Sequence, residues 1–223
     1  YKAQILESQM GGLLLKINEN EVWVRLIGTF NAYNLLAIYG TAVELGLDYF
    51  EVLRLLSELE SVSGRFQYII SNEKITAIVD YAHTPDALEN VLKTINDIRT
   101  KNEQLITIVG CGGDRDKAKR PIMANIASAM SDKTIITSDN PRTEKPEDII
   151  ADMEQGVEPQ NFKKTMSITD RKQAIQAACQ MAQPNDIILI AGKGHETYQE
   201  IQGVRYDFDD MKIVKELLIQ LNK

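Results

Sequence analysis

The stretch ITAIVDYAHTPDALENVLKTINDI, residues 75–98, decides how this chain folds. Its first five residues, 75–79, form a short run rich in β-branched side chains, which is typical of a strand buried on both faces. A polar loop follows, and the next segment begins at Pro85, whose fixed φ and missing N–H suit the first turn of a helix. The stretch therefore predicts a strand, a loop and a helix in succession.

The same unit recurs along the rest of the chain. Further strands are predicted by similar apolar runs at residues 105–109, 134–137 and 187–190. Helices are predicted at residues 85–98, 121–130, 146–153, 171–181 and 210–221, and three of them begin with proline. This alternation predicts an α/β fold with a Rossmann-like, mostly parallel sheet flanked by helices.

Residues 1–63 have a different pattern. A hairpin is predicted over residues 12–26, and apolar residues at helical spacing predict helices at 31–45 and 49–59. The sequence Ser61-Val62-Ser63-Gly64 then interrupts the pattern. We therefore predict a small α+β piece at residues 1–63 and a larger α/β domain at residues 64–223.

The composition narrows the class of protein. The 223 residues are 43% hydrophobic, which is enough for a buried core, and the formal net charge is −7. No Lys/Arg stripe offsets this charge, so we expect neither nucleic acid nor an anionic membrane as the main partner. The two cysteines lack disulfide or metal spacing, which indicates a reducing, cytoplasmic setting. The chain has no signal peptide and no initiator Met, and we expect it to be a fragment.

Polar loops follow all four predicted parallel strands, at residues 80–85, 110–117, 139–144 and 192–196. Ligands of open parallel sheets bind beyond the carboxyl ends of the strands. We therefore expect these loops to converge on one site.

The loops allow several kinds of chemistry. Gly110 to Gly113 could cradle a phosphate or simply form a tight turn, and the surrounding residues match neither GxGxxG nor a P-loop. His83 and His195 could bind a metal with Cys111 and Asp80, or could hold backbone groups in their loops. Cys111 itself is either a nucleophile or a small residue in a glycine turn.

The charged residues of the loops suggest a zwitterionic ligand. Arg115 and Arg142 each offer a planar guanidinium that suits a carboxylate, and Pro141 stiffens the loop before Arg142. Asp139 and Glu196 supply negative charge for an amino group. Surface salt bridging is the alternative explanation of the same charges.

At these loops the chain resembles the Mur ligase family. The resemblance rests on DYAHTPDAL (80–88), GCGGDRDKAKRP (110–121), DNPRTE (139–144) and GKGHE (192–196), with GTFNAYN (28–34) and GRF (64–66) in the same order. It implies that residues 1–63 are the tail of a central ATPase domain. Residues 64–223 would then be a C-terminal Rossmann-like domain that binds the incoming amino acid.

The resemblance also implies an activity. Mur ligases use ATP to form an amide, and the motifs resemble those of the members that add meso-diaminopimelate to UDP-MurNAc-L-Ala-D-Glu during peptidoglycan precursor synthesis. ATP and Mg²⁺ would be bound mainly by the part of the central domain that this chain lacks, so we expect the chain alone to be inactive. The alternatives are an L-lysine-adding Mur ligase, a folylpolyglutamate synthetase, a non-catalytic Rossmann-type nucleotide-binding module and a metal hydrolase.

The family's site residues carry over by motif. Contacts to meso-diaminopimelate are implied for Arg115, Asp139, Asn140, Pro141, Arg142, Gly192 and Glu196. Positions that approach ATP are implied at Asn34, Arg65, Asp80 and His83. No residue of this chain is assigned a catalytic role or a metal. Met211 departs from the arginine that relatives often carry there, and the start of that helix receives no role.

Overall fold

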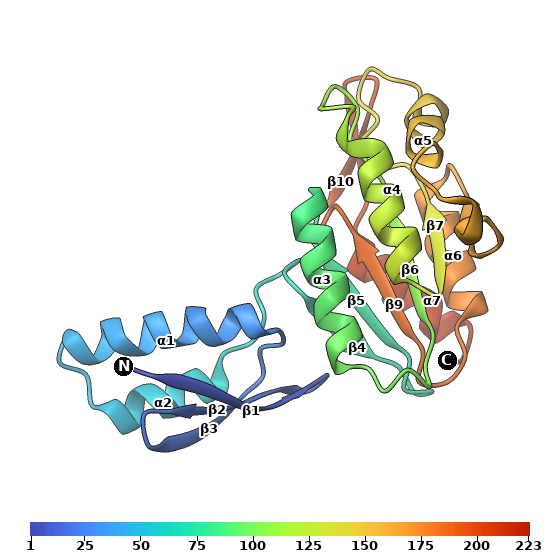
Figure 1. Ribbon diagram of the computed structural model, residues 1–223. Coiled ribbons are helices and arrows are strands. Elements are labelled where there is room, and N and C mark those ends of the chain that lie inside the picture. Colours follow the sequence, from blue (N-terminus) through green and yellow to red (C-terminus); the bar gives the residue numbers. More distant parts are fainter. The chain divides into compact units, whose positions relative to one another are not determined.

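The computed structural model describes residues 1–223 and divides into two compact units (Figure 1). The smaller unit comprises Tyr1–Val62 with Thr94–Arg99, and the larger unit comprises Ser63–Lys93 with Thr100–Lys223. The assignment of these units to two domains of a ligase remains a prediction.

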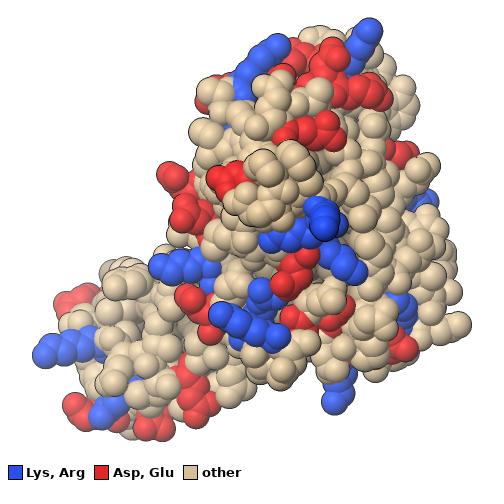
Figure 2. Space-filling model, turned by 45° about the vertical axis from the view of Figure 1, so that its right-hand side comes forward, with Lys and Arg blue, Asp and Glu red and all other residues tan.

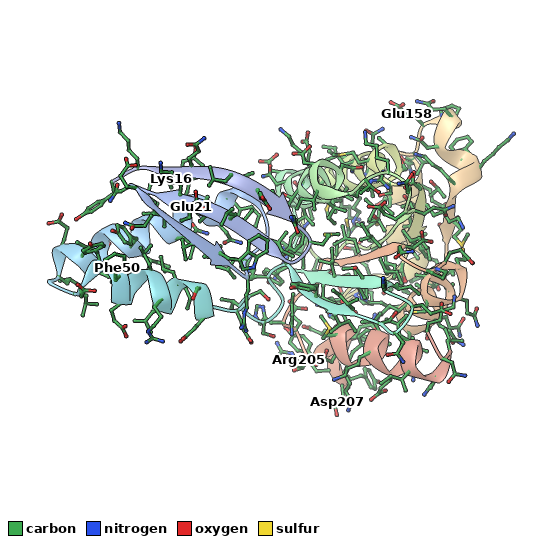
Figure 3. All side chains as sticks on the ribbon, turned by 90° about the horizontal axis from the view of Figure 1, so that it is seen from below. Lys16, Glu21, Phe50, Glu158, Arg205 and Asp207 are labelled. Carbon is green, nitrogen blue, oxygen red and sulfur yellow. The ribbon has the colours of Figure 1, made fainter.

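The smaller unit is an antiparallel sheet covered by two helices. Its strands are β1 (Ala3–Gln9), β2 (Gly12–Ile17) and β3 (Asn20–Val24), and its helices are α1 (Thr29–Glu44) and α2 (Tyr49–Glu58). Buried β2 and β3 side chains pack with buried residues of α1 and α2 in a core of their own. Lys16 and Glu21 are opposite each other in the β2–β3 pairing, and Figure 3 labels both.

The larger unit is built on a six-stranded sheet in the order β4-β5-β9-β6-β7-β8. These strands are β4 (Gln67–Ile70), β5 (Thr76–Asp80), β6 (Leu105–Val109), β7 (Lys133–Ile136), β8 (Thr165–Ser167) and β9 (Ile187–Ala191). Only β4 is antiparallel to its neighbour, and the other pairings are parallel. The predicted mostly parallel α/β sheet is confirmed.

Helices cover both faces of this sheet. They are α3 (Pro85–Ile98), α4 (Lys119–Met130), α5 (Pro146–Glu154), α6 (Arg171–Met181) and α7 (Asp210–Gln220), with a 3₁₀ turn at Pro159–Lys164. Figure 1 shows α3 and α4 in front of the sheet and α6 and α7 behind it. Every residue of β5, β6 and β9 is buried, as the apolar runs predict. The sheet therefore forms the centre of the core, and the loops that follow the parallel strands lie at the carboxyl ends of those strands.

Several elements were not predicted from the sequence. These are β1, β4, β8 and a hairpin of β10 (Tyr198–Ile201) and β11 (Val204–Asp207). All carry half-buried or exposed side chains, so they lack the apolar runs of the central strands. Helix α4 begins at Lys119, two residues before the predicted start at Pro121. Proline is tolerated there because N–H groups of the first helical turn have no partner within the helix.

None of the helices combines the length and the hydropathy that a bilayer span requires. On the face shown in Figure 2, acidic and basic side chains are interspersed rather than gathered into a stripe of one sign.

Candidate functional site

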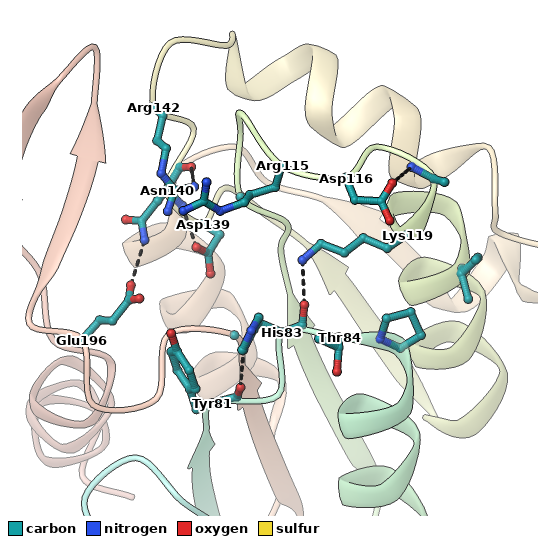
Figure 4. Close-up of a pocket in the computed structure, with 15 residues that line it drawn as sticks. Tyr81, His83, Thr84, Arg115, Asp116, Lys119, Asp139, Asn140, Arg142 and Glu196 are labelled. Atoms are coloured by element: carbon teal, nitrogen blue, oxygen red, sulfur yellow. Dashed lines mark hydrogen bonds between the residues drawn. The ribbon is translucent and has the colours of Figure 1, made fainter.

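The loops after β5, β6, β7 and β9 surround a cavity of about 610 Å³. The residues that line it come from all four loops and from the first turns of α3 and α4 (Figure 4). They are Tyr81, His83, Thr84, Pro85, Gly112, Arg115, Asp116, Ala118, Lys119, Ile122, Asp139, Asn140, Arg142, Gly192 and Glu196. The structure thus brings together the four segments that the sequence predicts to converge.

Asn140 is the centre of one wall of this cavity. It is 1% exposed, and its Nδ2 donates to Glu196 Oε2 at 2.8 Å. Its Oδ1 accepts from Lys193 Nζ at 2.9 Å and from the backbone N–H of Glu200 at 2.9 Å. Both the NH₂ and the oxygen of this amide are therefore held by protein, which fixes the wall.

Arg142 is held in an uncommon backbone conformation beside Asn140. Its φ is 52°, and two backbone hydrogen bonds hold it: Arg142 N donates to Glu200 O of β10 at 3.0 Å, and the turn residue after β10, Gln202, donates from its N to Arg142 O at 2.7 Å. The side chain is anchored by Nη1, which donates to Gly113 O at 2.8 Å. Nη2 makes no hydrogen bond to the protein and remains available to a ligand. An arginine held in this way is suited to bind a carboxylate.

Arg115 lines the same cavity and is exposed. Its Nη1 donates only a long hydrogen bond, 3.3 Å, to Asp114 O. Figure 4 shows Arg115, Arg142 and Asp139 close to Asn140, whose amide is hydrogen-bonded to Glu196, while His83 lies across from Arg115. Two guanidinium groups therefore share one cavity with three carboxylates, those of Asp116, Asp139 and Glu196.

Glycines let the loops of the cavity touch backbone to backbone. A Cβ at Gly113 would lie 1.9 Å from Pro141 O, and a Cβ at Gly64 would lie 2.0 Å from His195 N. Gly192, with φ 120°, would place a Cβ 2.7 Å from Asp139 Oδ2. The glycines at 112, 113 and 192 thus serve close packing between loops, and no side chain fits at the last two.

The residues matched to ATP-approaching positions lie in different surroundings. His83 lines the cavity, and its Nδ1 lies 2.9 Å from Tyr81 O. Arg65 is exposed and stacks over the Tyr81 ring at 5.1 Å. Asp80 is buried and accepts from Phe66 N at 2.6 Å, and burial raises the pKa of its carboxyl above the ordinary value. The carboxylate of Asp80 is therefore already engaged in a hydrogen bond with the protein backbone.

Four of the predicted site residues do not line the cavity: Arg65 and Asp80, described above, and also Pro141 and Asn34. Pro141 is buried behind the wall, where it packs against Gly113. Asn34 lies exposed on α1 of the smaller unit, and its Nδ2 donates to Asn31 Oδ1 at 3.2 Å.

Cys111 is unsuited to be a nucleophile. It is 2% exposed, its thiol contacts Met123 Sδ at 3.6 Å, and burial raises its pKa to about 12. The thiolate is the reactive form, so this cysteine fills the turn as a small core residue. No three His, Cys, Asp or Glu side chains of the chain are grouped as metal ligands. The geometry therefore does not support the hydrolase alternative.

Two buried arginines, Arg120 and Arg171, form ion pairs that stabilise the bases of the loops. The guanidinium of Arg120 donates hydrogen bonds to the Glu144 carboxylate at 2.7 and 3.0 Å and to the Asp152 carboxylate at 2.8 Å. Arg171 pairs with Asp210 at 2.8 and 2.9 Å and also donates to Ser138 O and Ala191 O. Ser138 and Ala191 directly precede Asp139 and Gly192. Asp210, at the start of α7, thus holds Arg171 beneath two of the site loops.

Lys193 is the main site residue that sequence reasoning missed. A lysine between two glycines resembles a surface or phosphate-binding loop, yet this side chain is fully buried. Gln199 was also missed; its Nε2 donates to Asp139 O at 2.6 Å. The dipeptide Gln202-Gly203 between two short strand-like runs could have revealed the hairpin that carries Gln199.

Comparisons with known proteins show which family the chain resembles. Residues 64–194 match the family model described as "Mur ligase, glutamate ligase domain". The UDP-N-acetylmuramoyl-L-alanyl-D-glutamate–2,6-diaminopimelate ligase of Cytophaga hutchinsonii is 56% identical over 223 residues, which cover all of this chain and 46% of that protein. The enzyme of the same name from Bacteroides thetaiotaomicron is 54% identical over 97% of this chain and 45% of its own length.

A solved structure of a protein with that name superposes with a TM-score of 0.74 at 41% identity. The match covers 99% of this chain and 45% of the other. The chain therefore spans less than half the length of the relatives it matches.

Proposed function

The chain belongs to the Mur ligase family, and from this we propose that it is the C-terminal part of a ligase that adds meso-diaminopimelate to UDP-MurNAc-L-Ala-D-Glu. Residues 64–223 would bind the incoming amino acid, and residues 1–63 would belong to the central domain that carries ATP. The names of the relatives, at 54–56% identity, support this choice of substrates.

The observation that carries the proposal is the shared cavity of Arg115, Arg142 and Glu196. Meso-diaminopimelate has an ammonium and a carboxylate at each end. Two guanidinium groups can each bind a carboxylate, while Glu196 and Asp139 can accept hydrogen bonds from ammonium groups. In this role the chain fixes the diamino acid so that its reacting amine is correctly oriented, and orientation is a large part of catalysis in amide formation.

Arg142 is what favours meso-diaminopimelate over L-lysine. L-Lysine has no second carboxylate, so it would leave Nη2 of Arg142 without an acceptor, while the side chain would keep its hydrogen bond to Gly113 O and its 4.0 Å contact with Glu200. Arg142 is largely buried, at 20% side-chain exposure, and its backbone N–H and C=O are both hydrogen-bonded to the β10–β11 hairpin. Moving Arg142 out of the site would therefore cost free energy, and this cost disfavours the binding of L-lysine, which has one carboxylate fewer.

ATP and Mg²⁺ would be held mainly by the part of the ligase that lies outside this chain. The groups that fit ATP are Arg65 and His83, because one is an exposed cation and the other borders the cavity. Asp80 fits less well as a direct ligand because its carboxylate already accepts from Phe66 N. When bound, ATP supplies the activation of the acceptor carboxyl, while these residues would bind and orient it.

The test is Arg142→Ala in the full-length ligase, with amide formation measured for meso-diaminopimelate and L-lysine in parallel. We expect the KM for meso-diaminopimelate to rise on the order of 100-fold, the scale of a lost hydrogen bond between charged groups. The KM for ATP should stay nearly constant. Arg54→Ala, which removes an exposed arginine of the smaller unit, is the matched control. An equal rise in the KM for meso-diaminopimelate and in the KM for ATP would show that Arg142 has a role in folding and would contradict the proposal.

A further inference from the structure

Lys193 holds a buried positive charge directly behind the cavity wall. The side chain is 0% exposed, and its Nζ donates to Asn140 Oδ1 at 2.9 Å and to Glu196 Oε2 at 3.1 Å. The flanking Gly192 and Gly194 both have positive φ, 120° and 53°, in the loop after β9. Taking an ammonium group out of water is costly unless it is paired, so these two contacts have to be maintained in the folded protein.

The first consequence concerns the amide of Asn140. Its oxygen faces two donors, Lys193 Nζ and Glu200 N, while its NH₂ group faces the Glu196 carboxylate. An amide turned by 180° would set NH₂ against the ammonium and the oxygen against the carboxylate. Lys193 thereby selects one orientation of Asn140.

The second consequence concerns Glu196. Both Lys193 Nζ and Asn140 Nδ2 donate to the same oxygen, Oε2. Oε1 has no hydrogen-bond partner in the protein, and Glu196 lines the cavity. The carboxylate is therefore held at one oxygen and offers the other to a ligand.

We propose that Lys193 is a positioning residue for the ammonium group of the diamino acid. It lies behind the wall and does not line the cavity, so it acts through Glu196 and Asn140 rather than by touching the substrate. Without it, Glu196 loses a charged donor and Asn140 loses the contact that fixes its amide, so the free oxygen of Glu196 no longer has a set direction. This inference rests on the proposed function, because it names how the amino-acid site is held.

The experiment uses Lys193→Met in the full-length ligase, since methionine has a similar length and no charge. We expect the KM for meso-diaminopimelate to rise at least about tenfold, with the KM for ATP within about twofold of wild type. Lys172→Met removes an exposed lysine on α6 and should leave both constants unchanged. An unchanged KM for meso-diaminopimelate, or an equal rise for ATP, overturns the proposal.

A double-mutant cycle separates positioning from general stability. If Lys193 acts through Glu196, then Lys193→Met in a Glu196→Gln background should change the KM by less than about threefold. If the KM change of the double variant equals the product of the changes in the two single variants, the proposal is overturned. Lys193→Arg serves if the methionine variant does not fold: it keeps the charge but displaces the donors, and it should raise the KM for meso-diaminopimelate without affecting that for ATP. A wild-type KM in this variant would equally contradict the inference.

The wild-type enzyme tests the proposed function separately, because it must form amide product from meso-diaminopimelate. If it uses L-lysine instead, the proposed substrate is wrong, and the same variants measured with L-lysine still decide the role of Lys193. L-Lysine also presents an ammonium group to Glu196.

Discussion

At the scale of residues, buried arginines connect the site loops to the rest of the larger unit. Arg120 is fully buried at the start of α4 and donates to both carboxylate oxygens of Glu144. The same carboxylate accepts from Asp114 N at 2.7 Å. Glu144 therefore joins the loop after β6 to the loop after β7, so the positions of Arg115 and Arg142 depend on it.

The titration of Glu144 gives a prediction for stability against pH. The hydrogen bonds from Arg120 and from Asp114 N lower its pKa from 4.5 to about 2. A carboxyl with a lowered pKa in the folded state stabilises the fold above its unfolded pKa and loses that contribution as pH falls through the folded pKa. Glu144→Gln should thus lower the free energy of unfolding by about 1.5–3 kcal/mol at pH 7, the scale of a charged hydrogen bond.

Urea unfolding at several pH values measures this difference between Glu144→Gln and wild type. It should shrink between about pH 4.5 and pH 2, the window set by the two pKa values. Glu89→Gln, at an exposed position of α3, should show no such trend. A difference that is constant down to pH 2 would contradict the assigned role of Glu144.

At the scale of elements, the hairpin β10–β11 supports the loop that carries Arg142. Gln199 and Glu200 contact Asp139 and Asn140, and Gln202 N donates to Arg142 O. The turn residues Gln202 and Gly203 both have positive φ, 51° and 77°, as in a two-residue hairpin turn of type I′. The geometry of this turn therefore influences the site.

Replacing Gly203 tests the role of the hairpin. No atom lies within 4 Å of a Cβ at this position, so the cost of a substitution is conformational. Gly203→Val should lower the stability by about 1–2 kcal/mol, because β-branched residues disfavour the left-handed region. The KM for meso-diaminopimelate should rise several-fold. Gly203→Asn is the control, since asparagine tolerates the left-handed region. If thermal unfolding and kinetics do not distinguish the two variants, the hairpin turn does not influence the loop that carries Arg142.

The elements also show how far sequence reasoning reaches. The central strands could be predicted because they are buried on both faces, as all five residues of β9 are. Strands at the sheet edges and in hairpins, such as β4 and β11, have exposed side chains and lack that pattern. Loop residues such as Arg115 and Arg142 could be predicted to converge from the parallel topology alone. Lys193 could not, because its burial depends on Asn140, which is distant in sequence.

At the scale of the whole molecule, each unit has its own hydrophobic core. The larger unit contains the complete six-stranded sheet and all residues that line the cavity. The smaller unit exposes several large apolar side chains, among them Tyr33 at 78% and Leu45 at 80%. The two units should therefore differ in their ability to fold alone.

A chain of residues 63–223 should fold without the smaller unit. We expect circular dichroism to show a cooperative thermal transition within a few degrees of the intact chain, because the sheet and its helices stay complete. Residues 1–62 alone should unfold without a cooperative transition, since a core of this size rarely suffices. A non-cooperative transition for residues 63–223 would show that the larger unit depends on the smaller one.

The close approach of the glycine loops also sets limits for enzyme engineering. Because Gly113 and Gly64 place neighbouring backbones against each other, substitutions there would push adjacent loops apart. Mutant libraries that seek to alter the proposed amino-acid preference should leave these glycines fixed. Diversity belongs instead at Arg115, Asp116 and Ile122, which face the cavity from exposed positions and can accept new shapes while the scaffold behind them keeps its form.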